Sequence, residues 1–157
     1  MSFQISALSP AQFEPLFELS DEALKQRGMS RLIVDCENGY PDRITLKDAS
    51  LGDELILLNY EHQKMPNAYQ SKGPIFVSRS RAEPHTLIDT IPDSLSRRML
   101  SFRGYSKDGD MLEGEVIDGK AFRQSVETFF ANENIAYIHV HFASRGCYAA
   151  RVDRLNV

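Results

Sequence analysis

The clearest alternation of polar and apolar residues lies near the end of the chain, over 135–142. Its even positions are apolar, and from 137 on its odd positions are the polar or amphipathic residues Tyr137, His139 and His141. Successive side chains of a strand point to opposite faces. The pattern therefore predicts a strand that turns both histidines to one face, away from the core.

A second strand follows, and two registers compete across the turn. A two-residue turn would pair Phe142 with Cys147 and place Arg151 and Asp153 on the apolar face, where burying charge is costly. A three-residue turn over 144–146, with Gly146 in the left-handed conformation, gives pairs that agree in polarity. We predict this second register, which opposes Ala143 to Cys147, Phe142 to Tyr148, His141 to Ala149, His139 to Arg151, and Tyr137 to Asp153.

In the remainder of the chain, the pattern of apolar and turn-forming residues predicts mostly short strands. We expect them over 3–8, 31–36, 43–46, 54–62 and 75–77, with a hairpin of 99–106 and 111–117 around Asp108-Gly109. The segment 54–62 is apolar on both faces at first, which predicts a central strand. Short helices are expected over 9–17, 20–28 and within 91–96.

The best helix spans 119–132, with Asp118 as its cap and one apolar stripe formed by Phe122, Val126, Phe129 and Phe130. Most connections therefore join strands. We expect an α+β fold: a curved, largely antiparallel sheet, partly closed as a barrel in one version, with one main packed helix and short N-terminal helices. The length of 157 residues favours a single domain over 1–157.

The composition limits the kinds of partner that we expect the protein to bind. The chain has 18 basic and 22 acidic residues, a net charge of −4, which argues against nucleic acid and anionic membranes. The longest apolar run, 55–58, is too short to span a bilayer, and residues 1–6 do not begin a signal peptide. Two cysteines imply no disulfide framework, so we expect a cytoplasmic protein.

The predicted polar face carries the first candidate chemistry. A histidine near neutrality can relay a proton, and Arg151 offers a planar fork for an anion. We take His139, His141 and Cys147 as catalytic candidates, and Arg151 and Tyr137 as ligand-binding ones. The alternatives are a hydrogen-bonded network that closes the sheet, and a cysteine that simply packs.

A second candidate set lies at the end of the strand over 54–62. Asn59 and His62 belong to a run of polar residues where a buried strand emerges, and strand ends often carry sites. Arg103 stands within a predicted strand and so needs an acidic partner or an anionic ligand. The plainer interpretation is a strand end that meets water.

The pair His139-Val140-His141 also fits a metal site, since both rings point to one side. Remaining ligands would have to come from His62 with Glu61, or from His85 with Glu83. Nothing in the sequence fixes them nearby. The sequence alone therefore assigns neither a metal ligand nor a cofactor.

Five parts of the chain carry a family resemblance: residues 57–63, 73–77, 139–141 together with 146–154, and the N-terminal segments 3–8 and 19–22. They resemble an uncharacterised bacterial family catalogued as domain of unknown function twelve hundred and three. The likeness covers nearly the whole chain. It implies a stand-alone bacterial domain and carries over no catalytic residues.

We therefore expect a small cytoplasmic protein with a polar pocket for a small, anionic molecule, whose chemistry, if any, would be proton transfer or hydrolysis. One alternative is a divalent-metal protein that uses His139 and His141. Another is a non-enzymatic interaction module that pairs with a partner or forms a homodimer through a sheet edge.

Overall fold

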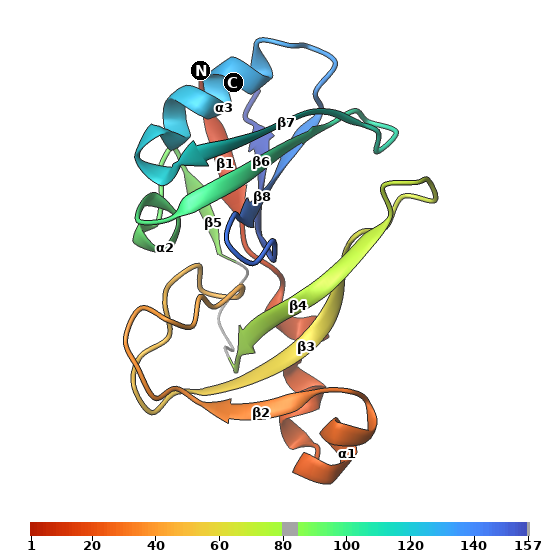
Figure 1. The fold of residues 1–157 in the computed structure, drawn as a ribbon, viewed down its shortest axis with the longest axis vertical. Coiled ribbons are helices and arrows are strands. Elements are labelled where there is room, and N and C mark those ends of the chain that lie inside the picture. The colour runs from red at the N-terminus through yellow and green to blue at the C-terminus, as the bar shows by residue number, and fades with distance from the viewer. Residues whose placement is uncertain (80–84, 157) are drawn as a thin grey trace.

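In the computed structural model, which describes residues 1–79 and 85–156, the strands form two antiparallel sheets. The larger has six strands in the order β5-β1-β9-β8-β6-β7, and the smaller has three in the order β2-β3-β4 (Figure 1). The predicted α+β fold with curved, antiparallel sheets is confirmed. Within the described residues both sheets are open, so the barrel version is wrong.

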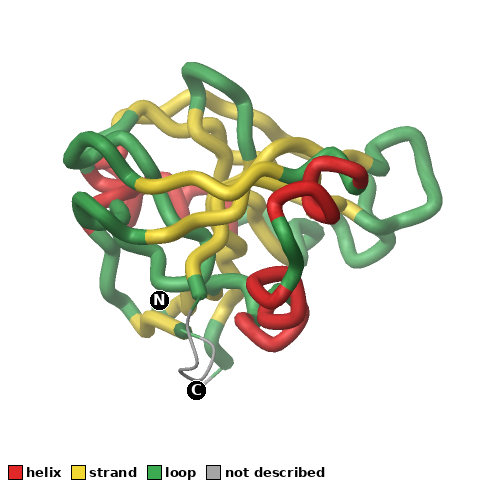
Figure 2. Tube along the Cα trace, turned by 90° about the horizontal axis from the view of Figure 1, so that it is seen from below, coloured by secondary structure: helices red, strands yellow, loops and turns green. Residues whose placement is uncertain are grey.

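The elements are short. The strands are β1 (Phe3–Ser6), β2 (Ser30–Ile33), β3 (Glu54–Gln63), β4 (Ser71–Ser78), β5 (Thr86–Ile88), β6 (Met99–Tyr105), β7 (Met111–Asp118), β8 (Tyr137–Phe142) and β9 (Tyr148–Arg154). The helices are η1 (Pro10–Gln12), η2 (Glu14–Glu18), α1 (Asp21–Gln26), α2 (Asp93–Ser96), η3 (Gly119–Ala121) and α3 (Phe122–Phe130). Figure 2 shows the strands running through the molecule with the helical segments around them.

The six-stranded sheet buries the larger core. The predicted apolar stripe of α3 (Phe122, Val126, Phe129 and Phe130) is buried against inward-facing residues of β1, β6, β8 and β9. Asp118 accepts a hydrogen bond from Lys120 N at 2.9 Å and caps the start of η3, as expected. The β6–β7 hairpin turns at Gly109, whose φ of +82° is the left-handed conformation that glycine adopts without strain.

The three-stranded sheet buries one face against the N-terminal segment. β3 is its central strand, as predicted. Ser20 accepts from Ala23 N at 3.1 Å and so begins α1, whereas the helix expected over 9–17 is two 3₁₀ turns. The buried cluster between them also includes Tyr148 of β9, so apolar packing links the two sheets.

The strand predicted over 43–46 is wrong. This segment is a turn around the buried carboxylate of Asp42, which accepts from the backbone N–H groups of Ile44 and Ser78, each at 3.0 Å, and from Thr45 Oγ1 at 2.9 Å. Leu46 closes the turn with φ of +59°. An acid that can satisfy several local donors competes with the strand ladder, and here it prevails.

The predicted β8–β9 register is confirmed over most of the hairpin. Tyr137 opposes Asp153, and His139 opposes Arg151. Beyond Val140 the register shifts, so that His141 opposes Tyr148 instead of Ala149. A bulge adds one residue to one strand and reverses the side to which the following residues point. The predicted pairings of Phe142 and Ala143 across the turn are therefore wrong.

Candidate functional site

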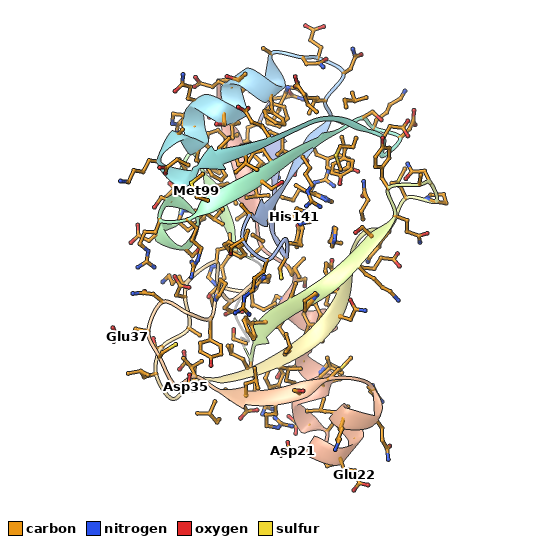
Figure 3. The ribbon with its side chains drawn as sticks, in the orientation of Figure 1. Asp21, Glu22, Asp35, Glu37, Met99 and His141 are labelled. Atoms are coloured by element: carbon orange, nitrogen blue, oxygen red, sulfur yellow. The ribbon has the colours of Figure 1, made fainter. Side chains whose placement is uncertain are left out.

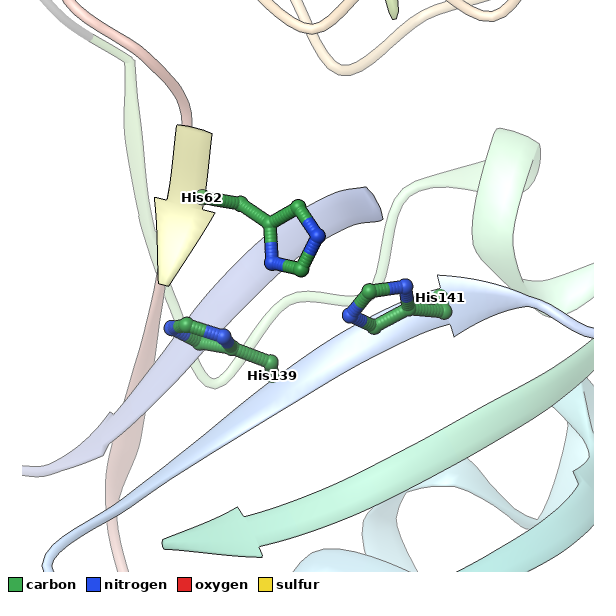
Figure 4. Close-up of side chains that lie close together, drawn as sticks. All are labelled: His62, His139 and His141. Atoms are coloured by element: carbon green, nitrogen blue, oxygen red, sulfur yellow. The ribbon is translucent and has the colours of Figure 1, made fainter. Parts of the chain in front are cut away.

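Three histidines meet between the two sheets. His139 and His141 lie on β8, and His62 comes from the end of β3 (Figure 4). Each offers one ring nitrogen to a common space, and these nitrogens all lie within 4.8 Å of one another. Among the described residues, no carboxylate or thiol joins this group.

The histidine face of β8 is buried, which corrects the prediction that it points away from the core. His139 is 3% exposed and His141 is fully buried, because β3 and Tyr148 cover them. Figure 3 shows His141 between the sheets, while the labelled acids Asp21, Glu22, Asp35 and Glu37 lie near the three-stranded sheet. The site is thus an interior one.

A bulge brings His62 into the site. The β3–β4 register shifts between Glu61 and Gln63, so His62 is the unpaired extra residue. Such bulges re-aim side chains. His62 turns toward β8, whereas Asn59, predicted to join it, remains exposed opposite Pro74 and does not line the site.

Hydrogen bonding fixes one ring and leaves three nitrogens without a partner. His141 Nδ1 lies 2.8 Å from the carbonyl oxygen of Gly146. Since a carbonyl only accepts, Nδ1 carries the proton and Nε2 carries the lone pair. His141 Nε2, His139 Nδ1 and His62 Nδ1 are buried with no hydrogen-bond partner. Buried polar atoms without a partner are rare in folded proteins, so these three call for a physical explanation.

Burial also keeps the rings neutral. Desolvation lowers the pKa of His62 to about 4, that of His141 to about 3 and that of His139 to about 2, and the positive charge of Arg103 acts in the same direction. At neutral pH each ring is therefore uncharged, with one N–H nitrogen and one nitrogen that carries a lone pair and can accept a hydrogen bond or bind a metal.

Tyr148 completes the cluster, although the predicted register pairs it with Phe142 and so puts it on the opposite face. Its ring stacks on His62 at 5.3 Å between centroids and 5° between planes, and meets His139 and His141 edge-on at 5.2 and 5.7 Å. The bulge in the hairpin causes this change of side. No residue pattern in the chain marks that bulge.

A cleft of about 590 Å³ adjoins the histidines. His62 and His139 line it, together with Tyr137 and Arg151, so the predicted ligand-binding pair does lie beside the histidines. Gln63, not singled out from the sequence, donates from Nε2 to the Tyr137 hydroxyl at 2.8 Å. Its place in the polar run at the end of β3 was the available signal.

The two arginines expected to bind an anion differ in whether a carboxylate pairs with them. Arg151 forms a bidentate pair with Asp153, with Nε and Nη2 both 2.8–3.0 Å from the carboxylate, and its guanidinium lies 4.1 Å from the centre of the Tyr137 ring. Arg103 donates to Ser101 Oγ at 3.4 Å and also interacts with the Tyr105 hydroxyl. Of the two arginines, Arg103 is the one that no carboxylate of the described residues pairs with.

The cysteines and the remaining proposed metal ligands lie away from the three histidines. Cys147 lines a different cavity, on the far side of the β8–β9 turn, and is not brought to the histidines. Cys36 and Cys147 are both free thiols. His85 is not part of the cluster, and Glu83, named with it as a ligand source, lies outside the described residues.

The comparisons with known proteins identify the family without a mechanism. No helix in the described part of the chain is both long and apolar enough to cross a bilayer. No curated protein and no solved structure matches the sequence. A family model does match, over residues 39–154, which include all three histidines, and the chain therefore belongs to the family described as Protein of unknown function (DUF1203).

Proposed function

We propose that this protein binds one divalent transition-metal ion through His62, His139 and His141, at the wall of a cleft that admits a small anionic molecule. One observation carries the proposal: each of the three histidines offers one ring nitrogen to a common space, and one nitrogen of each ring is buried with no hydrogen-bond partner among the described residues. Neutral imidazole is the commonest metal ligand in proteins. The bond from His141 Nδ1 to Gly146 O supports it, since metal-binding histidines are usually oriented by such a partner.

Zinc fits the ligand set best. A catalytic zinc site uses three protein ligands and one open position, with zinc–nitrogen distances of about 2.0–2.1 Å, which places the nitrogens about 3.3 Å apart in a tetrahedron. The candidate ligand nitrogens lie within 4.8 Å of one another, so the rings would have to move inward on binding. His62 is half-buried and lies on a bulge, so it is the ring with room to move.

Charge supports an anion as the fourth ligand. Three neutral imidazoles leave the ion with its full positive charge, no carboxylate of the described residues joins the cluster, and Arg103 adds to the positive field. A metal-bound hydroxide or a small carboxylate in the cleft would balance it. Metal-assisted hydrolysis is the chemistry that this arrangement favours, because the ion lowers the pKa of its bound water.

Proton transfer by a free histidine is the weaker candidate. A general base works best when its pKa lies near the working pH. Burial lowers the pKa of all three rings to about 4 or below, so each is a weak base at neutral pH. The same burial leaves them well suited to hold a metal.

We also propose a cytoplasmic setting. Both cysteines are free thiols. Free thiols persist in reducing compartments.

Elemental analysis of protein purified without a metal-affinity tag tests the proposal, with about one equivalent of metal expected. Adding zinc to the stripped protein at a hundred times its dissociation constant should stabilise it by about 2.7 kcal/mol, a rise of about 5–10 °C in Tm. Substituting cobalt should give the visible absorption of a four- or five-coordinate ion. His141→Ala should abolish all three results.

His85→Ala is the matched control, because His85 lies outside the cluster. It should retain the metal and the thermal shift. Metal well below one equivalent, together with no shift on adding zinc, iron or manganese, would show that the histidines form a metal-free structural cluster.

A further inference from the structure

A second, larger cavity lies apart from the histidine cleft. Its volume is about 1000 Å³, and the two linings have no residue in common. The β8–β9 turn, the segment before Arg43 and parts of β3 and β4 surround it. Much of its wall is apolar, including Leu32, Leu57, Pro74, Phe76, Met99 and Phe142.

Arg43 is the buried charge in this cavity. Arg43 is 3% exposed, and its guanidinium lies 5.0 Å from the centre of the Phe142 ring and 5.9 Å from the centre of the Phe76 ring. Nε donates to Tyr148 O at 2.8 Å, and Nη1 donates to Pro41 O at 2.5 Å. Two neutral carbonyls and two aromatic rings therefore hold the group in place without cancelling its charge.

No described acid forms an ion pair with Arg43, although the negative charges of Asp42 and Asp48 nearby partly offset the effect of burial on its pKa. Among the residues that the structure describes, no carboxylate forms an ion pair with it, and Nη2 donates to no acceptor. Two further arginines line the cavity, and no acid does. Arg98 is paired with Asp48 at 2.7 Å, whereas Arg145 is exposed and unpaired within the same described residues.

A buried charge without a counter-ion is unfavourable. Desolvation lowers the pKa of Arg43 to about 10, so the group still carries its charge at neutral pH. The protein thus keeps a buried cation that no described carboxylate contacts, with Nη2 free of acceptors among the described residues, on the wall of a cavity large enough for an organic molecule.

We propose that this cavity binds an organic monocarboxylate with an apolar body, whose carboxylate pairs with Arg43. A planar carboxylate matches the guanidinium fork. The aliphatic and aromatic wall suits a hydrocarbon or aromatic body, and the exposed Arg145 adds attraction at the rim. The proposal is independent of the metal site.

The probe is 3-phenylpropionate, with 3-phenylpropanol as the uncharged match. Titrations followed by ¹H–¹⁵N NMR, on chelator-treated protein, should move the Arg43 Nε–H signal and the amides of Phe142 and Cys147. Charge-assisted hydrogen bonds contribute about 1.5–3 kcal/mol, so the acid should bind about 10- to 100-fold more tightly than the alcohol. Arg43→Gln should abolish that preference.

Arg145→Glu keeps the test valid should Arg43→Gln fail to fold. It reverses an exposed charge at the rim and should weaken acid binding roughly threefold or more, with little effect on alcohol binding. Arg27→Glu, at the exposed end of α1, is the matched reversal away from the cavity and should change neither.

Three results would overturn the proposal. Equal affinity for acid and alcohol would remove the role of the Arg43 charge. Inorganic phosphate binding as tightly as the acid would remove the role of the apolar wall. Shifts confined to residues around the histidines would place the acid in the other cleft. Because the metal is stripped, none of these results bears on the metal proposal.

Discussion

Replacing His139 with leucine tests whether burial keeps this histidine uncharged in the folded protein. His139 is 3% exposed, and its Nδ1 has no partner, so the substitution removes an unpaired polar atom from the interior. Burial lowers the pKa of His139 to about 2, far below the ordinary value of 6.5. The unfolded chain therefore binds more protons than the folded one below pH 6.5, and the wild type loses stability as the pH falls.

The size of this loss of stability follows from the difference between the pKa of His139 in the folded and in the unfolded chain. At pH 5 the unfolded histidine gains about 2 kcal/mol from protonation, which the folded one does not share, and at pH 7.5 the gain is about 0.1 kcal/mol or less. The leucine variant lacks this penalty. Its free energy of unfolding relative to the wild type should therefore rise by about 2 kcal/mol between pH 7.5 and pH 5.

Urea denaturation with chelator present, at both pH values, measures this change. Tyr148→Phe is the control: it alters the same cluster, and because burial raises the pKa of Tyr148, its difference from the wild type should not change between the two pH values. A His139→Leu difference that is equal at both pH values would refute the reasoning, since His139 would then protonate in the folded state as readily as in the unfolded chain.

Two further predictions concern stability. Gln63→Leu should cost about 1–3 kcal/mol in urea denaturation because it leaves the buried Tyr137 hydroxyl without its partner, and adding Tyr137→Phe should restore part of that loss; additive effects would contradict the pairing. Gly119→Ala should lower the free energy of unfolding by more than about 2 kcal/mol because its Cβ would lie 2.1 Å from Leu95 O, whereas Gly73→Ala, with nothing within 4 Å, should stay within about 0.5 kcal/mol; equal effects would refute the steric reasoning.

Local patterns predicted most of the fold. The alternation over 135–142 gave β8, and polarity matching gave the pairing of His139 with Arg151. The stripe that includes Phe122 and Phe130 gave α3, and the Asp-Gly pair gave the β6–β7 turn. Each of these depends on neighbours in the chain or across a single turn, which a sequence displays directly.

The site depended on features that no local pattern displays. A bulge at His62 and another opposite His141 decide which side chains enter the site, and no residue pattern marks the position of either. Division of the strands into two sheets buried a face that alternation alone predicted to be exposed. Tyr148 and Cys147 consequently exchanged sides, and Asn59 was left outside.

The three histidines come from two sheets, His62 from the three-stranded one and His139 and His141 from the six-stranded one, and His62 precedes His139 by 77 positions (139 minus 62). An ion held between them would close a long loop, and a reversible cross-link of that kind restricts the unfolded chain much as a disulfide does. Metal binding would then hold the two sheets together. Removing the metal with a chelator would loosen the contact between β3 and β8, so backbone hydrogen exchange there would become faster before either sheet unfolded.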